Sequence, residues 1–172
     1  MNLLDIIKSR RSIRSHTDQP IAEDDLRKLV EAGNWAPSAS SKFPWGIVII
    51  QQRELIKKIQ AVSPGMLGSP TAIMVLCANR DKALEEGGTS GRDLFCIMDI
   101  THAAQNICLV ATELRIGSCC IMSFNPAAVA ELLNLPENTT ADYLISLGYA
   151  KGPVKTPKRR SIDEAIISWI KG

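Results

Sequence analysis

The sequence predicts an α+β domain in which helices pack around a central sheet. Two helical segments come first, and β-branched apolar runs then alternate with further helices. This order favours a mixed α+β or three-layer architecture. The 172 residues, of which 45% are hydrophobic and 22% charged, suffice for one compact domain with a substantial core. We therefore expect residues 1–172 to form a single domain.

Start and stop residues mark the helices in the first half of the chain. Asn2 is a good N-cap for a first helix, which we expect to continue through the basic residues 10–14. A second helix is predicted over residues 22–32, with Gly33 as its terminator. Residues 53–62 are amphipathic and predict a third helix.

The remaining elements follow from apolar runs and breakers. Four β-branched runs predict buried strands, over residues 45–50, 71–78, 116–122 and 143–148. Residues 79–92 are polar and glycine-rich, which predicts a mobile loop. Residues 93–115 lack Gly and Pro and are apolar on more than one face, which predicts a helix buried in the core or at a subunit interface. We also expect two short helices, over residues 125–134 and 163–171, and a basic tail over residues 151–161.

Composition argues against several classes of function. A net charge of +2 and an aromatic content of 5% are too low to suggest nucleic-acid binding. No apolar run approaches the roughly 20 residues that span a bilayer, and the start lacks the regions of a secretory signal. The five cysteines are odd in number and lie in apolar segments, which predicts reduced core residues in a cytoplasmic protein.

The motifs of common nucleotide and metal sites are missing from the sequence. No strand is followed by the Gly-x-Gly-x-x-Gly pattern of a Rossmann site, and there is no P-loop pattern. His16 and His102 are the only histidines and lack ligand spacing to a cysteine, so we expect no metal site. The sequence shows no catalytic triad or carboxylate pair, so we expect no catalytic protein residue.

A basic cluster near the start, Arg10-Arg11-Ser12-Ile13-Arg14, indicates anion binding. On a continuing helix, Arg10 and Arg14 share one face and Arg11 neighbours Arg14. Close guanidiniums repel unless an anion joins them, and each offers a planar fork of donors that fits a phosphate. Ser12 adds a hydroxyl donor. The alternative is a solvated helix end whose cations complement the helix dipole.

Two further segments could complete a pocket. Lys158-Arg159-Arg160 could share an anion with the first cluster, or could simply keep an exposed tail soluble. Residues 36–45, Ala-Pro-Ser-Ala-Ser-Ser-Lys-Phe-Pro-Trp, combine a fixed backbone with small hydroxyl groups and could contact a flat, polar ring. A structural turn is the alternative for this loop.

Taken together, these features resemble the FMN-dependent nitroreductase family over essentially the whole chain. The matching motifs occur in the family's order and include residues 10–14, 36–39 with 44–45, 68–70, 104–106, 114–118 and 147–149. The resemblance implies a three-layer α/β/α fold with a central mixed sheet flanked by helices. It also implies an obligate homodimer with FMN at the subunit interface.

The resemblance assigns FMN-binding roles to particular residues. Arg10, Arg11 and Ser12 would hold the FMN phosphate and ribityl chain. Arg14 would lie near the ribityl chain and the pyrimidine edge of the flavin. The tail arginine on the phosphate is best matched by Arg159, with Lys158 and Arg160 as alternatives. The residues expected along the flavin ring come from the loop, supplied by the other subunit, and from a strand: Pro37, Ser38, Ala39, Ser41, Cys120, Ile121 and Met122.

Three positions depart from the family pattern. Ser41 stands where the family often has Asn, and it reaches less far. Phe43 replaces a Gln, and Met122 occupies a position where Gly is common. These changes leave the contacts to the flavin edge open. The chain is also short, so the 79–92 segment is the only lid expected over the substrate channel.

The implied function is an FMN-dependent oxidoreductase with ping-pong kinetics. NADH or NADPH would donate a hydride to FMN, and a nitroaromatic, quinone or similar electron-poor acceptor would then receive it. The alternative is a non-redox FMN-holding or FMN-consuming protein of the same fold. Neither the physiological acceptor nor the choice between NADH and NADPH follows from the sequence.

Overall fold

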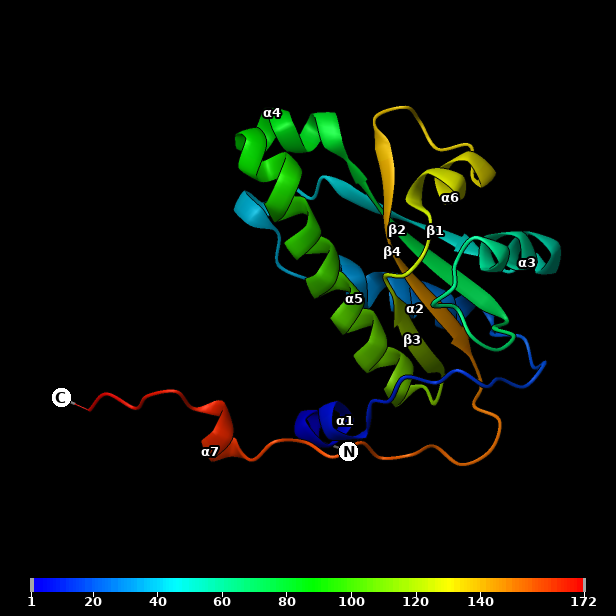
Figure 1. Ribbon diagram of the computed structural model, residues 1–172, viewed down its shortest axis with the longest axis vertical. Coiled ribbons are helices and arrows are strands. Elements are labelled where there is room, and N and C mark those ends of the chain that lie inside the picture. The colour runs from blue at the N-terminus through cyan, green and yellow to red at the C-terminus, as the bar shows by residue number, and fades with distance from the viewer. Residues whose placement is uncertain (1, 172) are drawn as a thin grey trace.

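The computed structural model describes residues 2–171 as a three-layer α+β fold (Figure 1). A four-stranded sheet, in the order β1-β2-β4-β3, separates two layers of helices. Its strands are β1 (Trp45–Ile50), β2 (Ala72–Asn79), β3 (Gly117–Ile121) and β4 (Thr139–Gly148). The helices on one face are α2 (Glu23–Asn34) and α5 (Cys96–Glu113), and those on the other are α3 (Arg53–Ala61) and α6 (Pro126–Leu132). The smaller helical elements are α1 (Leu3–Ser9), η1 (Ala39–Ser41), α4 (Arg80–Ser90), η2 (Gly91–Phe95) and α7 (Ile162–Ala165).

Burial on both faces of β2 explains the layers. Met74 and Leu76 belong to the core cluster of α2 and α5, whereas Ile73 and Val75 belong to the cluster of α3 and α6. All four side chains are 0% exposed. Because successive strand residues point to opposite faces, an uninterrupted apolar run requires cover on both sides. The predicted strands and the three-layer arrangement are confirmed.

The named strands pair antiparallel throughout. Parallel pairing enters at the outer edge of β3, through an isolated bridge between Ser12 and Ser118. Within residues 2–171, the sheet is therefore mixed only at this edge. The bridge comes from the segment that follows α1, which lies along β3 instead of packing as a helix.

The prediction that the first helix continues through residues 10–14 is wrong. Asn2 caps α1 as expected, but the helix ends at Ser9, and Arg10 turns to ψ 130°. The amide of Ile13 then donates to the Ser118 carbonyl at 2.9 Å. The open edge of β3 supplies hydrogen-bond partners that a lone helix end lacks. We call residues 10–14 the basic segment.

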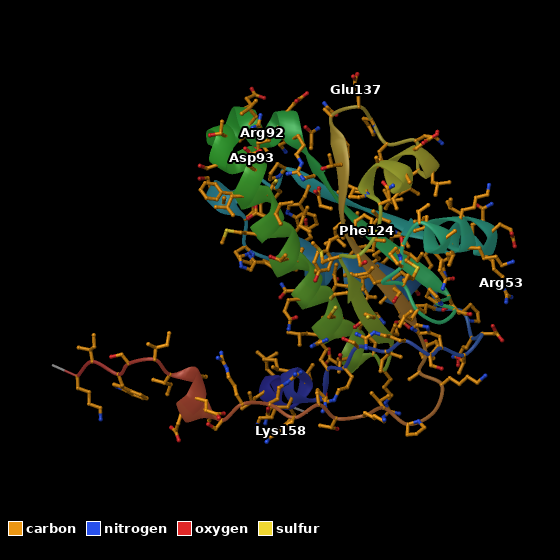
Figure 2. The ribbon with its side chains drawn as sticks, viewed as in Figure 1. Arg53, Arg92, Asp93, Phe124, Glu137 and Lys158 are labelled. Atoms are coloured by element: carbon orange, nitrogen blue, oxygen red, sulfur yellow. The ribbon has the colours of Figure 1, made fainter. Side chains whose placement is uncertain are left out.

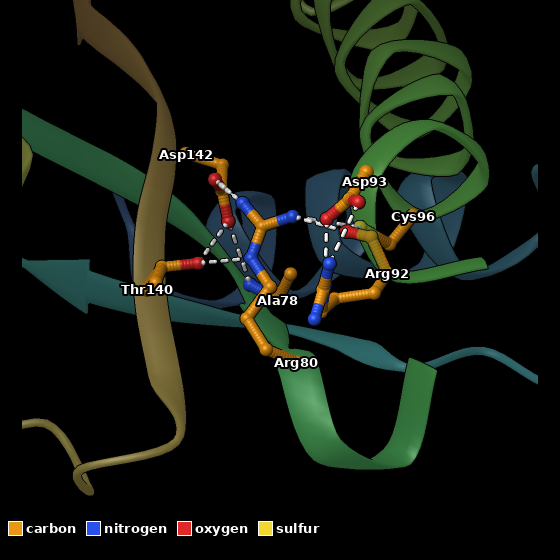
Figure 3. A network of polar contacts seen from close by, with 7 residues as sticks. All are labelled: Ala78, Arg80, Arg92, Asp93, Cys96, Thr140 and Asp142. Carbon is orange, nitrogen blue, oxygen red and sulfur yellow. Dashed lines mark hydrogen bonds and ion pairs between the residues drawn. The ribbon is translucent and has the colours of Figure 1, made fainter. Parts of the chain in front are cut away.

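The prediction of a mobile loop over residues 79–92 is also wrong, because α4 fills most of this segment. Arg80 ties α4 to the sheet through an ion pair with Asp142 and a 2.8 Å hydrogen bond to Thr140 (Figure 3). Its guanidinium also donates to the Arg92 carbonyl at 2.6 Å, which connects the beginning of α4 to η2, the element that follows it. These contacts stabilise a helix that its polar, glycine-rich sequence does not favour.

The helix expected over residues 93–115 is confirmed as a core element. The continuous helical stretch Arg80–Glu113 is long and apolar enough, by length and composition alone, to cross a membrane. Its α5 part instead packs against both α2 and the sheet, with Ile100 and Ile107 fully buried. Burial against the protein's own elements accounts for the hydrophobicity of this face, whereas Leu94, Phe95 and Met98 remain 54%, 39% and 46% exposed.

Gly68 lets the loop before β2 approach the basic segment closely. Its φ is +76°, and a Cβ at this position would lie 2.1 Å from the Arg14 carbonyl oxygen. Only glycine tolerates both the left-handed backbone and this contact. The close approach fixes the backbone that carries Arg14.

Candidate functional site

The basic segment lies along the outer edge of β3, and the charges of its two end arginines act on different cysteines of that strand. A hydrogen bond with Cys108 lowers the pKa of Cys120, and the charge of Arg10 acts in the same direction. Burial raises the pKa of Cys119, and the charge of Arg14 opposes that shift. Cys119 and Cys120 are adjacent strand residues and point to opposite faces of β3, so the charges of Arg14 and Arg10 act on cysteines of different faces.

The cations of the basic segment form no ion pair with any acidic group of residues 2–171. Within residues 2–171, no carboxylate lies within ion-pair distance of Arg10, Arg11 or Arg14. Arg11 donates to the carbonyls of Lys8 at 2.6 Å and Arg10 at 2.8 Å, so it serves the end of α1. The alternative of a basic helix end therefore applies to Arg11, which bonds to carbonyls at the end of α1. Arg10 and Arg14 are suited to an external anion.

The C-terminal tail passes beside α1 and carries the second basic cluster. Arg11 donates to the Thr156 hydroxyl at 3.4 Å, and Figure 2 shows Lys158 on the tail just beyond this contact. Lys158, Arg159 and Arg160 are all exposed. The structure thus places both basic clusters on the same side of the molecule.

Asp99 of α5 holds the loop of residues 37–43. The Ser38 hydroxyl donates to Asp99 Oδ2 at 2.8 Å, and the Ala39 amide donates to Oδ1 at 3.0 Å. The same hydroxyl accepts a 2.9 Å bond from the Phe43 amide. Asp99 is only 4% exposed, so these bonds satisfy a buried carboxylate. These hydrogen bonds hold the loop in one conformation.

The loop backbone is strained and borders an apolar cavity. Ser40, Ser41 and Phe43 have positive φ values of 53°, 55° and 50°, which non-glycine residues adopt only when their surroundings impose it. A cavity of about 260 Å³ lies against the loop, and its lining also includes Phe95 and Met98. Such a surface can accept a flat, largely apolar group.

A single chain does not bring the loop and the basic segment together. Asp99 lies near the start of α5, whereas Thr112, near its end, lines a cavity of about 190 Å³ beside Arg11. The step of 13 residues along the helix from Asp99 to Thr112 spans about 20 Å at 1.5 Å per residue. The two groups of predicted site residues therefore sit at opposite ends of α5.

The predicted strand residues lie with the basic segment. Cys120 is half-buried and packs toward α5, whereas Ile121 is buried on the other face. Met122 follows the strand and is 59% exposed. Within residues 2–171, the outer edge of β3 beyond Ser118 pairs with no other strand, so its backbone polar groups can meet a ligand.

Sequence reasoning missed Asp99 as the anchor of the loop. The available indication was that Asp99 lies within a helix that is otherwise apolar on several faces. A carboxylate buried in such a helix requires hydrogen-bond partners. The identity of those partners, 60 and 61 residues away, becomes visible only in the fold.

We predict that Asp99→Ala loosens the loop and lowers stability by about 1.5–3 kcal/mol, the range for hydrogen bonds to a charged group. Urea unfolding measures the loss, and hydrogen exchange at the Ala39 amide should accelerate. Asp93→Ala is the matched control, since Asp93 sits close by on η2 and makes an exposed pair with Arg92. We expect little change in the control. Equal losses in both variants would contradict the anchoring role.

Comparison with known proteins identifies the family. A model of the nitroreductase family matches residues 7–64 and 61–149. A proposed NADH dehydrogenase/NAD(P)H nitroreductase of Archaeoglobus fulgidus is 36% identical over 154 residues, which cover 86% of this chain and 85% of that protein. The FMN reductase (NAD(P)H) of Bacillus subtilis is 31% identical over 77% of this chain and 61% of its own length.

A solved structure agrees with these sequence matches. A proposed NADH oxidase of Clostridium acetobutylicum is 28% identical and superposes with a TM-score of 0.81, over 96% of this chain and 100% of the other. The family model and the archaeal relative each cover most of the chain. The chain therefore belongs to the nitroreductase family.

Proposed function

We propose that this chain is an FMN-dependent NAD(P)H oxidoreductase that works as a homodimer. The observation that carries the proposal is the separation of two well-built half-sites at opposite ends of α5. A second copy related by a two-fold axis can place its loop against the basic segment of the first. Each dimer would then hold two complete sites, and residues 1–172 would form one FMN-binding domain.

The edge of β3 has the donors that FMN requires. Arg10 can bind the phosphate through its guanidinium fork, and the Ser12 hydroxyl can donate to the phosphate or ribityl chain. Arg11 keeps donors for the same group beyond those used at the end of α1. Arg159 is the first candidate among the tail cations for the phosphate. Arg14 would stabilise negative charge at the pyrimidine edge of the flavin.

The loop and β3 would enclose the flavin ring from two sides. Pro37, Ser38, Ala39 and Ser41 of one subunit would approach the ring, with their backbone already fixed by Asp99. Residues 120–122 of the other subunit would offer backbone polar groups along it. FMN, when bound, supplies the transfer of a hydride from NADH or NADPH to a nitroaromatic, quinone or similar acceptor. The protein positions the reactants, so no side chain has to act as acid or base.

We expect FMN-loaded protein to be reduced by a nicotinamide. Under anaerobic conditions, mixing with NADH or NADPH should bleach the flavin absorption band within seconds, and adding a quinone should restore it. Free FMN at the same concentration is the control. If neither nicotinamide bleaches the band, the non-redox alternative replaces this proposal.

We predict that Arg10→Ala weakens FMN binding by about 1.5–3 kcal/mol, or roughly 10–150-fold in Kd, because a charge-assisted hydrogen bond is lost. Quenching of flavin fluorescence during titration of the flavin-free protein measures the affinity. Arg53→Ala is the control, because Arg53 lies on α3, across the sheet from α5 (Figure 2). An unchanged Kd in Arg10→Ala would remove Arg10 from the phosphate site.

The tail supports the homodimer. It runs past α1 and away from the body of the molecule (Figure 1). Its apolar side chains are exposed, with Trp169 at 73%, Ile170 at 92% and Ile167 fully accessible. An apolar patch of this kind marks an interaction site. A second copy would bury this patch.

We also propose a cytoplasmic location. All five cysteines are free thiols, which suits that compartment.

We predict that the double variant Ile167→Asp, Ile170→Asp shifts the protein from dimer toward monomer, because burying two charges opposes association. Light scattering after size exclusion should report twice the 18.8 kDa chain mass for the native protein and a lower mass for the variant. Lys155→Asp changes the same tail at a polar position and should leave the mass unchanged. A native protein with the mass of one chain would contradict the dimer.

A further inference from the structure

Two cysteines from different elements face each other beneath the edge of β3. Cys108 Sγ on α5 and Cys120 Sγ on β3 lie 3.5 Å apart, close enough to share a hydrogen bond. Both are free thiols. Cys108 is 1% exposed, whereas Cys120 is half-buried. Cys120 is therefore the more exposed member of the pair, and the Cys108 sulfur lies next to its sulfur.

The surroundings of Cys120 favour its thiolate. The hydrogen bond with Cys108 lowers the pKa of Cys120, and the Tyr143 hydroxyl and the charge of Arg10 act in the same direction, against the effect of burial. Cys108 shows the reverse, because its pKa is raised by the bond with Cys120 and by burial. The pair thus combines a nucleophilic thiolate with a neighbouring thiol.

We propose that Cys108 and Cys120 form a peroxide-sensitive dithiol that closes into an intramolecular disulfide. Cys120 is the attacking cysteine, because it is the more exposed member of the pair, whereas Cys108 is 1% exposed. Cys108 is the resolving cysteine, because its sulfur is already in contact with the sulfur of Cys120. The inference does not rest on FMN binding.

The reaction balances with hydrogen peroxide as the oxidant. The Cys120 thiolate attacks one peroxide oxygen, the O–O bond breaks, and hydroxide leaves and takes up a proton as water. The resulting sulfenic acid is attacked by the Cys108 sulfur, whose proton leaves with the departing hydroxyl as a second water. Two thiols and one peroxide thus yield one disulfide and two waters, and the two electrons pass from sulfur to peroxide.

The geometry allows closure with a small movement. The sulfurs must approach from 3.5 Å to a bond length of about 2.0 Å, which rotation of the side chains and a slight shift of α5 against β3 can supply. The bond would then link the C-terminal half of α5 to the strand that lies beside the basic segment.

The other cysteines are less suited to this reaction. Burial raises the pKa of Cys77 to about 12, which leaves it a poor nucleophile near neutral pH. Cys119 is the neighbour of Cys120 in sequence but points to the opposite face of β3, and its Sγ contacts the Cys120 carbonyl at 3.6 Å. It therefore provides a matched control that differs mainly in direction.

The test uses the full chain, first reduced and freed of reductant, then exposed to a small molar excess of hydrogen peroxide. Thiols are trapped with N-ethylmaleimide under denaturing conditions and counted by intact mass. We expect three of the five thiols to remain, in a chain of monomer mass that has lost two hydrogen atoms. After trypsin digestion without reductant, residues 93–115 should be linked to residues 116–151.

Variants assign the bond to the proposed pair. Cys120→Ser and Cys108→Ala should yield no linked peptide, and Cys120→Ser should consume peroxide about tenfold more slowly. Cys119→Ser should form the bond as the native protein does. The proposal is overturned if the native protein keeps five thiols, if its Cys120 accumulates as sulfenic or sulfinic acid without a bond, or if Cys119→Ser abolishes the bond.

Discussion

The packing of α5 against α2 and the sheet is the constraint on which the rest of the structure depends. This apolar helix fills the core with Ile100, Ile107 and their neighbours. It also carries Asp99 near one end and Cys108 near the other. Because one rigid helix holds the loop at its start and contacts the edge of β3 toward its end, the distance between the half-sites is set by its length. Neither half can move toward the other without disrupting the core.

The layers of the fold could be predicted because their signals are local. The run of apolar residues in β2 and the absence of Gly and Pro over residues 93–115 are visible in short windows of sequence. The basic segment and α4 could not be predicted in the same way. Their conformations depend on Ser118 and on Asp142, partners that the fold brings from distant parts of the chain. Local propensity gives way where such tertiary contacts compete with it.

The candidate site, too, could be predicted only in part from the sequence. The types and order of its residues identified the basic segment and the loop, whereas the way each is held could not be inferred. Ser38 meets Asp99 across 61 residues, and Cys108 meets Cys120 across 12, with no spacing rule that relates either pair. Helical and strand periodicities place residues on a face of one element, but contacts between elements depend on packing. The family resemblance implies which residues would bind the flavin, and the structure shows which contacts hold those residues in place.

The edge of β3 joins the two proposals through electrostatics. In the proposed site, Arg10 binds an anionic phosphate, and the same guanidinium favours the thiolate of Cys120. These two negative groups compete for one cation. A disulfide between Cys108 and Cys120 is neutral, so oxidation would free the charge of Arg10 and strengthen its attraction for the phosphate. The sign of the effect follows from charge alone. Oxidation removes the negative thiolate and therefore its repulsion of the phosphate, and salt screening changes only the size of this effect.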